Sequence, residues 1–163
     1  VIADAGLFAR IEATTFDALR SDTDLLTDAV SASIRVKADI VERDERESGD
    51  RRKLNLGHTL AHAIEKCTNR LNHGEAVAVG TALIADASVK LGVLAAEDRD
   101  RIAGVLKKLG FDLTPPVDVK RLLKEADKDK KNEDGMLRIV VPVGIGDCEV
   151  RRMSHDEFAA LFA

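Results

Sequence analysis

Three of the four histidines of this chain, His58, His62 and His73, lie within a short stretch of the sequence. At 100° per residue, His58, His62 and Glu65 fall within a sector of roughly 60° on one helix face. His73 and Glu75 follow a short turn later, so they can return beside the same face. Imidazole and carboxylate groups together suit a divalent metal such as zinc and leave a coordination position open for a substrate. Helical spacing alone therefore makes His58 and His62 the candidate metal pair.

A simpler interpretation of the same residues is that both imidazoles are solvated on a helix surface. The spacing also differs from the metalloprotease pattern, because no Glu directly follows His58. Glu65 and Glu75 could accept hydrogen bonds that orient the imidazoles. They could equally be a surface carboxylate and a partner of a helix N-terminal dipole. We include neither among the metal ligands.

The elements that must position these side chains are mostly helical. Residues 1–20 read as a short helical or irregular lead-in, and residues 43–53 as a solvated connector. Alternation of apolar residues predicts a β-hairpin from residues 136–143 and 148–153. Apolar periodicity and capping signals predict helices over residues 24–45, 55–71, 74–91, 97–109 and 119–126, with a last short helix after Ser154. The expected fold class is therefore mainly α, a helical bundle with a small β-hairpin.

The predicted helix over residues 24–45 carries an apolar stripe, formed by Leu26, Val30, Ile34 and Val41. Such a stripe is typical of the packed face of an amphipathic helix. Lys37 falls on the same stripe. A lysine there must either extend its amine to solvent or meet a buried anion.

Composition narrows the class of protein. The chain has 163 residues, of which 45% are hydrophobic, with five Phe and neither Trp nor Tyr, which favours packed helices. A net charge of −4 gives no support for nucleic-acid binding. Two cysteines suit a reducing compartment, and the longest apolar run is too short to span a membrane. We expect a cytoplasmic protein without membrane or nucleic-acid partners, and the start at Val1 suggests part of a longer protein.

Three segments around the histidines resemble the signature run of the 3-dehydroquinate synthase family. They are Asn55-Leu56-Gly57-His58-Thr59, His62-Ala63-Ile64-Glu65, and His73-Gly74-Glu75-Ala76-Val77-Ala78-Val79-Gly80. The similarity extends to flanking segments, namely Lys37-Ala38-x-x-Val41, Asp44-Glu45-x-Glu47, Asp129-Lys130-Lys131 and Gly144-Ile145-Gly146.

This resemblance implies a two-domain enzyme. Residues 1–163 would be its helical C-terminal domain, which binds metal and substrate, while an N-terminal α/β domain that binds NAD would be absent from this chain. The enzymes of this family are lyases of the shikimate pathway, which leads to aromatic amino acids. It converts 3-deoxy-arabino-heptulosonate 7-phosphate to 3-dehydroquinate and phosphate with NAD and a zinc or cobalt ion. The resemblance also implies a homodimer for the full-length enzyme.

The resemblance changes the assignment of the histidines. It makes His58 and His73 the metal ligands and His62 a catalytic residue that contacts substrate and transfers a proton. The remaining substrate-binding residues that it implies are Lys37, Arg51, Asn55 and Lys130, with Lys131 as the alternative to Lys130.

Two features of the family pattern are missing from the sequence. The third metal ligand of the family is a glutamate in a segment that would precede Val1, and no Gly-x-Gly-x-x-Gly run follows a strand. We therefore expect the isolated chain to be inactive. A sister sugar-phosphate cyclase, such as an inosose or valiolone synthase, is the close alternative, although Lys37, Arg51 and residues 129–131 favour the shikimate-pathway enzyme. A non-catalytic helical metal-binding module is the alternative from a different class. An iron-type alcohol dehydrogenase lacks the Asn-Leu-Gly-His-Thr block.

Overall fold

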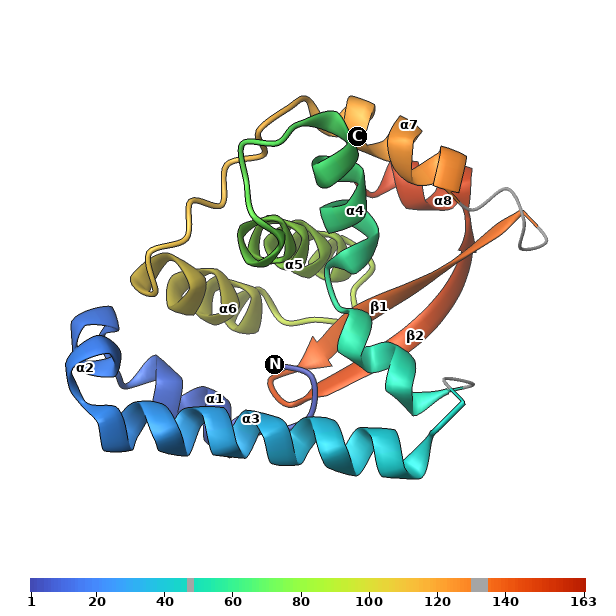
Figure 1. The fold of residues 1–163 in the computed structure, drawn as a ribbon. Coiled ribbons are helices and arrows are strands. Elements are labelled where there is room, and N and C mark those ends of the chain that lie inside the picture. The colour runs from blue at the N-terminus through green and yellow to red at the C-terminus, as the bar shows by residue number, and fades with distance from the viewer. Residues whose placement is uncertain (47–48, 130–134) are drawn as a thin grey trace.

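Helix α5 (His73–Lys90) lies in the middle of the molecule, and other elements pack around it (Figure 1). The computed structural model describes residues 1–46, 49–129 and 135–163. The other helices are α1 (Ala5–Glu12), α2 (Phe16–Ser21), α3 (Thr23–Arg43), the 3-10 helix η1 (Asp50–Asn55), α4 (His58–Cys67), α6 (Ala96–Lys108), α7 (Val119–Asp129) and α8 (His155–Ala160). Strands β1 (Met136–Gly144) and β2 (Asp147–Ser154) form an antiparallel pair. The predicted fold class, mainly helical with a small hairpin, is confirmed.

Helix α5 is central because it is apolar nearly all round. Its Ile84 packs with the inner face of the hairpin, and its Val79 packs with residues of α4 and α7. Its Ala85 packs with α1 and α6. Burial of each large aliphatic side chain contributes about 1.5–3 kcal/mol. One helix thus joins three clusters of the hydrophobic core.

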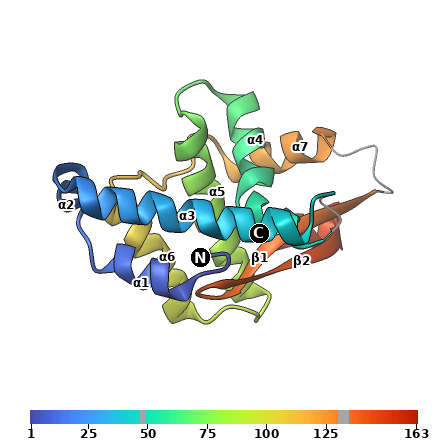
Figure 2. The ribbon, with the colours of Figure 1, turned by 60° about the horizontal axis from the view of Figure 1, so that its bottom comes forward.

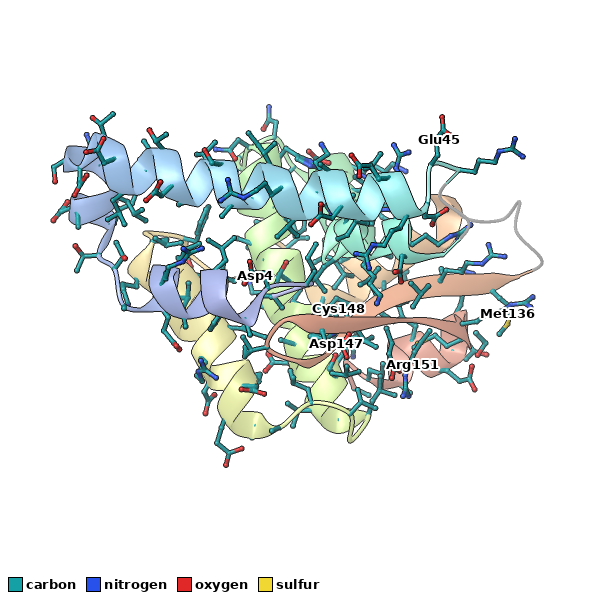
Figure 3. The ribbon with its side chains drawn as sticks, turned by 90° about the horizontal axis from the view of Figure 1, so that it is seen from below. Asp4, Glu45, Met136, Asp147, Cys148 and Arg151 are labelled. Carbon is teal, nitrogen blue, oxygen red and sulfur yellow. The ribbon has the colours of Figure 1, made fainter. Side chains whose placement is uncertain are left out.

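The hairpin turn is fastened to the start of the chain. Gly146, with φ +90°, donates its backbone N–H to the carbonyl oxygen of Val1 at 2.7 Å. Figure 3 shows Asp147 and Cys148 at this end of the hairpin, on the side of Asp4, the residue that caps the start of α1. Cys148 is buried, and this burial raises the pKa of its thiol to about 12. Cys148 is therefore a packed thiol.

Three of the four residues of the apolar stripe of α3 face solvent, so the expectation of a packed stripe is wrong for them, whereas Val41 is half-buried. Leu26, Val30 and Ile34 are 45%, 49% and 61% exposed, whereas the buried residues of α3 are Ala32 and Ile40. Figures 1 and 2 show α3 along the outside of the molecule. It packs through its other side on α1, α2 and η1. Periodicity identifies an apolar face but not the surface that covers it.

The helix boundaries near the histidines also differ from the prediction. Residues 50–55 form η1, and α4 begins at His58 instead of residue 55. The break falls at Gly57, whose φ of +79° places it in the left-handed region that glycine tolerates. The other predicted helices and both strands lie within a few residues of their expected bounds. No helix in the described part of the chain is long and apolar enough to cross a membrane.

Candidate functional site

Two glycines fix the start of α4 against α5. A Cβ atom added to Gly80 would lie 2.3 Å from the carbonyl oxygen of Gly57, closer than real Cβ atoms come to any such atom. A Cβ atom on Gly57 would lie 2.6 Å from the hydroxyl oxygen of Thr81. Only glycine allows this backbone contact, which places His58 as the first residue of α4.

The structure brings His58, His62 and His73 together at the ends of α4 and α5. The ring centroids of His58 and His73 are 5.3 Å apart, those of His58 and His62 are 5.8 Å apart, and those of His62 and His73 are 6.3 Å apart. On the far side of α4, Leu60 and Ile64 are fully buried. The helix is therefore amphipathic in the way that its sequence predicts, with the imidazoles on the open face.

Hydrogen bonds distinguish two of the imidazoles from the third. The Nδ1 atom of His58 lies 3.2 Å from the carbonyl oxygen of Leu56, and the Nδ1 atom of His73 lies 3.0 Å from Oε1 of Glu65. In both rings the Nε2 atom is left available for another ligand. His62 is exposed and makes no hydrogen bond within the described residues. Within the described residues, both ring nitrogens of His62 are therefore open to a bound molecule.

The spacing of the rings tests whether they fit a metal ion. Two imidazoles that bind one tetrahedral zinc ion through Nε2, at about 2.0–2.1 Å, have their ring centroids about 5.2 Å apart. The His58–His73 separation of 5.3 Å fits this value better than the His58–His62 separation of 5.8 Å. Imidazole nitrogen suits zinc and cobalt alike. Within the described ranges, no three His, Cys, Asp or Glu side chains are already arranged to hold a metal ion. The residues therefore fit two of the ligands of such an ion.

Arg51 lies on η1, and hydrogen bonds to Asp44 at the end of α3 hold this segment in place. A carboxylate oxygen of Asp44 accepts hydrogen bonds from the backbone N–H groups of Gly49, at 2.7 Å, and Arg51, at 3.0 Å. The guanidinium group of Arg51 donates to the carbonyl oxygen of Glu45 at 2.7 Å. Asn55 is exposed at the last position of η1, directly before the Leu56-Gly57 junction. The bracing by Asp44 keeps this polar segment in front of α4.

The remaining predicted substrate-binding residues are dispersed. Lys37 is exposed on α3, where it borders a mainly apolar cavity of about 310 Å³ together with Leu54 and Thr81. Lys130 and its alternative Lys131 lie outside the described residues. Neither Lys37 nor Arg51 forms a hydrogen bond or ion pair with a histidine in the part of the chain that the structure describes. The structure therefore brings together the histidines, but it does not bring the cationic side chains onto them.

Sequence reasoning missed two contributions to this site. The contact between Gly57 and Gly80 had a usable signal, since an isolated glycine inside an apolar helix often marks a close backbone approach. The sequence signal for Asp44 as an acceptor of backbone hydrogen bonds was weaker. It rests on the fact that an Asp after a helix commonly bonds to nearby N–H groups. Gly57, Gly80 and Asp44 all act on the backbone that presents the histidines and Arg51.

Comparison with known proteins gives matches in sequence. A profile of the 3-dehydroquinate synthase C-terminal family matches residues 1–132. The 3-dehydroquinate synthase of Ruegeria sp. (strain TM1040) is 42% identical over 157 residues, which cover 90% of this chain and 42% of that protein. The 3-dehydroquinate synthase of Nitrosospira multiformis is 41% identical over 153 residues, which cover 92% of this chain and 42% of that protein. The chain thus spans less than half the length of these curated relatives.

Solved structures match in fold. The 2-epi-5-epi-valiolone synthase of Streptomyces hygroscopicus subsp. jinggangensis, solved with NAD+ and Zn2+, aligns with a TM-score of 0.84 at 21% identity over 99% of this chain and 46% of that chain. A 2-deoxy-scyllo-inosose synthase, solved with carbaglucose-6-phosphate, NAD+ and Co2+, aligns with a TM-score of 0.75 at 20% identity over 96% of this chain and 49% of that chain. At these identities the structural matches show a shared fold alone.

Proposed function

Because the chain belongs to the 3-dehydroquinate synthase family, we propose that it forms the metal- and substrate-binding part of an enzyme that makes 3-dehydroquinate. The reaction is the conversion of 3-deoxy-arabino-heptulosonate 7-phosphate to 3-dehydroquinate and phosphate. The sequence of this chain has no glycine-rich dinucleotide-binding run. In this proposal, NAD is therefore bound by another part of the enzyme.

One observation carries this proposal. The His58 and His73 rings are 5.3 Å apart, and each has its Nδ1 atom occupied by an oxygen acceptor. This leaves both Nε2 atoms for one divalent cation, in the tetrahedral spacing that zinc favours. The geometry supports the ligand pair that the resemblance implies, and it disfavours the pair that helical spacing alone suggests.

We assign the other polar side chains to the substrate. His62 projects from the same face of α4 and exchanges a proton at a ring nitrogen, since imidazole can both donate and accept near neutral pH. Arg51 and Asn55 bind phosphate or hydroxyl groups, and Lys37 and Lys130 add positive charge for the anionic groups. When bound, the cation polarises the alcohol that becomes a ketone. The homodimer and the cytoplasmic location stay predictions.

The experiment that tests the proposal restores a complete enzyme. The chain is fused behind the amino-terminal part of the Nitrosospira relative, and release of phosphate from the heptulosonate phosphate is measured with NAD and zinc. We expect turnover by the fusion, none by the isolated chain, and strong loss in a His62→Ala fusion. A fusion that binds zinc but turns over only a different sugar phosphate would refute the assigned substrate.

The same fusion separates the proposal from its close alternative. The cyclases with known structures share the fold at about 20% identity, whereas relatives at about 40% identity are 3-dehydroquinate synthases. Sequence similarity therefore favours the heptulosonate phosphate over the substrates of those two cyclases, which serve as the competing substrates in the assay. Tight, stoichiometric zinc binding by the chain alone would instead support a self-sufficient metal-binding module.

A further inference from the structure

Glu65 makes a contact that the proposed reaction does not use. Its Oε1 atom lies 3.0 Å from Nδ1 of His73, and the two side chains are 35% and 55% exposed. Glu65 lies on α4, seven residues after His58, and His73 is the first residue of α5. The contact therefore links the helix that carries one proposed metal ligand to the imidazole that provides the other.

The chemistry of the two groups determines which atom carries the proton. An ionised carboxylate only accepts hydrogen bonds, so the Nδ1 atom of His73 must be the donor. A neutral imidazole has one N–H group, and Nε2 of His73 consequently keeps its lone pair. Loss of the acceptor would allow the proton to move to Nε2, the atom that a metal needs. Exposed pairs of this kind contribute little to folding stability, so the contact does more for orientation than for stability.

His58 shows the same arrangement with a different acceptor. Its Nδ1 atom faces the carbonyl oxygen of Leu56 at 3.2 Å, a backbone group that no substitution removes. His73 depends on a side chain instead. His62 has neither kind of acceptor within the described residues, which separates it from the two proposed ligands.

We propose that Glu65 is a positioning residue of the metal site, which holds His73 as the Nδ1–H tautomer with Nε2 directed to the cation. The inference rests on the proposed function, because it presumes that His58 and His73 bind a metal ion. Removal of such a hydrogen-bond acceptor behind a metal-binding histidine typically weakens metal binding about 10- to 100-fold. Glu65→Ala should have this effect, whereas Glu65→Gln should recover most of the affinity, because its amide oxygen still accepts from Nδ1.

The test uses two readouts, one on the 163-residue chain and one on its fusion with the amino-terminal part of the relative. Long-range ¹⁵N–¹H NMR spectra of the metal-free chain, at a pH where the imidazoles are neutral, report the tautomer of His73. Competition of the fusion with a chromophoric chelator reports the zinc dissociation constant. Glu75→Gln is the matched control, since it removes a carboxylate two residues from His73 that bonds to the backbone N–H of Asn72 and not to the imidazole. We expect this control to keep the tautomer and the zinc affinity of the wild-type chain.

The outcomes separate this inference from the function on which it rests. A shift of His73 towards Nε2–H together with a 10- to 100-fold loss of zinc affinity in Glu65→Ala would support the inference. Zinc binding within twofold of wild type in Glu65→Ala, with His73 still protonated on Nδ1, would overturn it alone. A wild-type chain and a fusion that both bind no zinc would overturn the proposed metal site and the inference together. Circular dichroism of each variant checks that α4 remains folded, since Ala is a strong helix former.

Discussion

Replacement of Gly80 by Ala tests the contact that positions His58. The added Cβ would lie 2.3 Å from the carbonyl oxygen of Gly57, so one helix must move at least 0.7 Å to reach the 3.0 Å limit of real contacts. The obstacle is backbone, which cannot rotate away as a flexible side chain can. Overpacking of a core costs about 1–3 kcal/mol, and we expect the upper end here. A gain of up to about 1 kcal/mol in helix propensity leaves a net loss of about 2 kcal/mol.

Gly104→Ala supplies the matched control for this substitution. Gly104 lies inside α6, and a Cβ atom there would meet no atom within 4 Å apart from the backbone of its own helix. The same change should therefore stabilise the chain by about 0.5–1 kcal/mol. Urea unfolding followed by circular dichroism measures both variants, and heat should unfold Gly80→Ala about 4–8 °C below wild type. If Gly80→Ala were as stable as Gly104→Ala, the contact between α4 and α5 would not be as close as described.

Three further predictions concern stability and reactivity. Ile34→Ala should change the free energy of unfolding by less than about 0.5 kcal/mol, whereas Ile64→Ala should cost about 2–5 kcal/mol, because Ile34 is 61% exposed and Ile64 is fully buried; urea titrations of both variants measure this contrast. The hydrogen bond from Arg101 lowers the pKa of Glu12 below its ordinary value of 4.5. The ionised carboxylate therefore stabilises the fold above pH 4.5, and this stabilisation is lost as the pH falls through the lowered pKa. Glu12→Gln should thus lower the urea midpoint at pH 7 but not at strongly acid pH, and an equal difference at both would contradict the pairing. Burial raises the pKa of Cys148 to about 12, so a thiol reagent at pH 8 should modify it only after unfolding, as mass spectrometry can show.

Much of the fold could be predicted because local signals agreed with tertiary packing. The Asn72 and Ser154 capping boxes begin α5 and α8, and Gly92 and Gly110 take positive φ angles just after α5 and α6. The orientation of α3 could not be predicted in this way. Its apolar stripe and its packed face differ, because small residues such as Ala32 make the contacts with the neighbouring elements.

Helical spacing predicted the residue types of the candidate site but not which histidines lie nearest to each other; the His58–His73 pair came only from the family resemblance. Spacing along one helix favours His58 with His62, since residues four apart share a face. The His58–His73 distance depends instead on where α5 begins relative to α4, and the contact between Gly57 and Gly80 sets that relation in space. Glu65 had an open role for the same reason, because its partner His73 lies on a different helix.

The electrostatics of the site explain why two imidazoles are a poor metal site by themselves. His58 and His73 each begin a helix, so the positive ends of two helix dipoles converge near the proposed cation. Helix N-termini of this kind favour anions, and they disfavour a divalent cation that only neutral imidazoles hold. The first turn of α4 contains no acidic residue, whereas the first turn of α5 contains Glu75, and Glu65 lies close to the His73 ring. Negative charge from an anionic ligand or a third, carboxylate ligand would offset both dipoles. The same arrangement that weakens binding of a bare cation is therefore compatible with the proposed binding of a cation together with an anionic ligand.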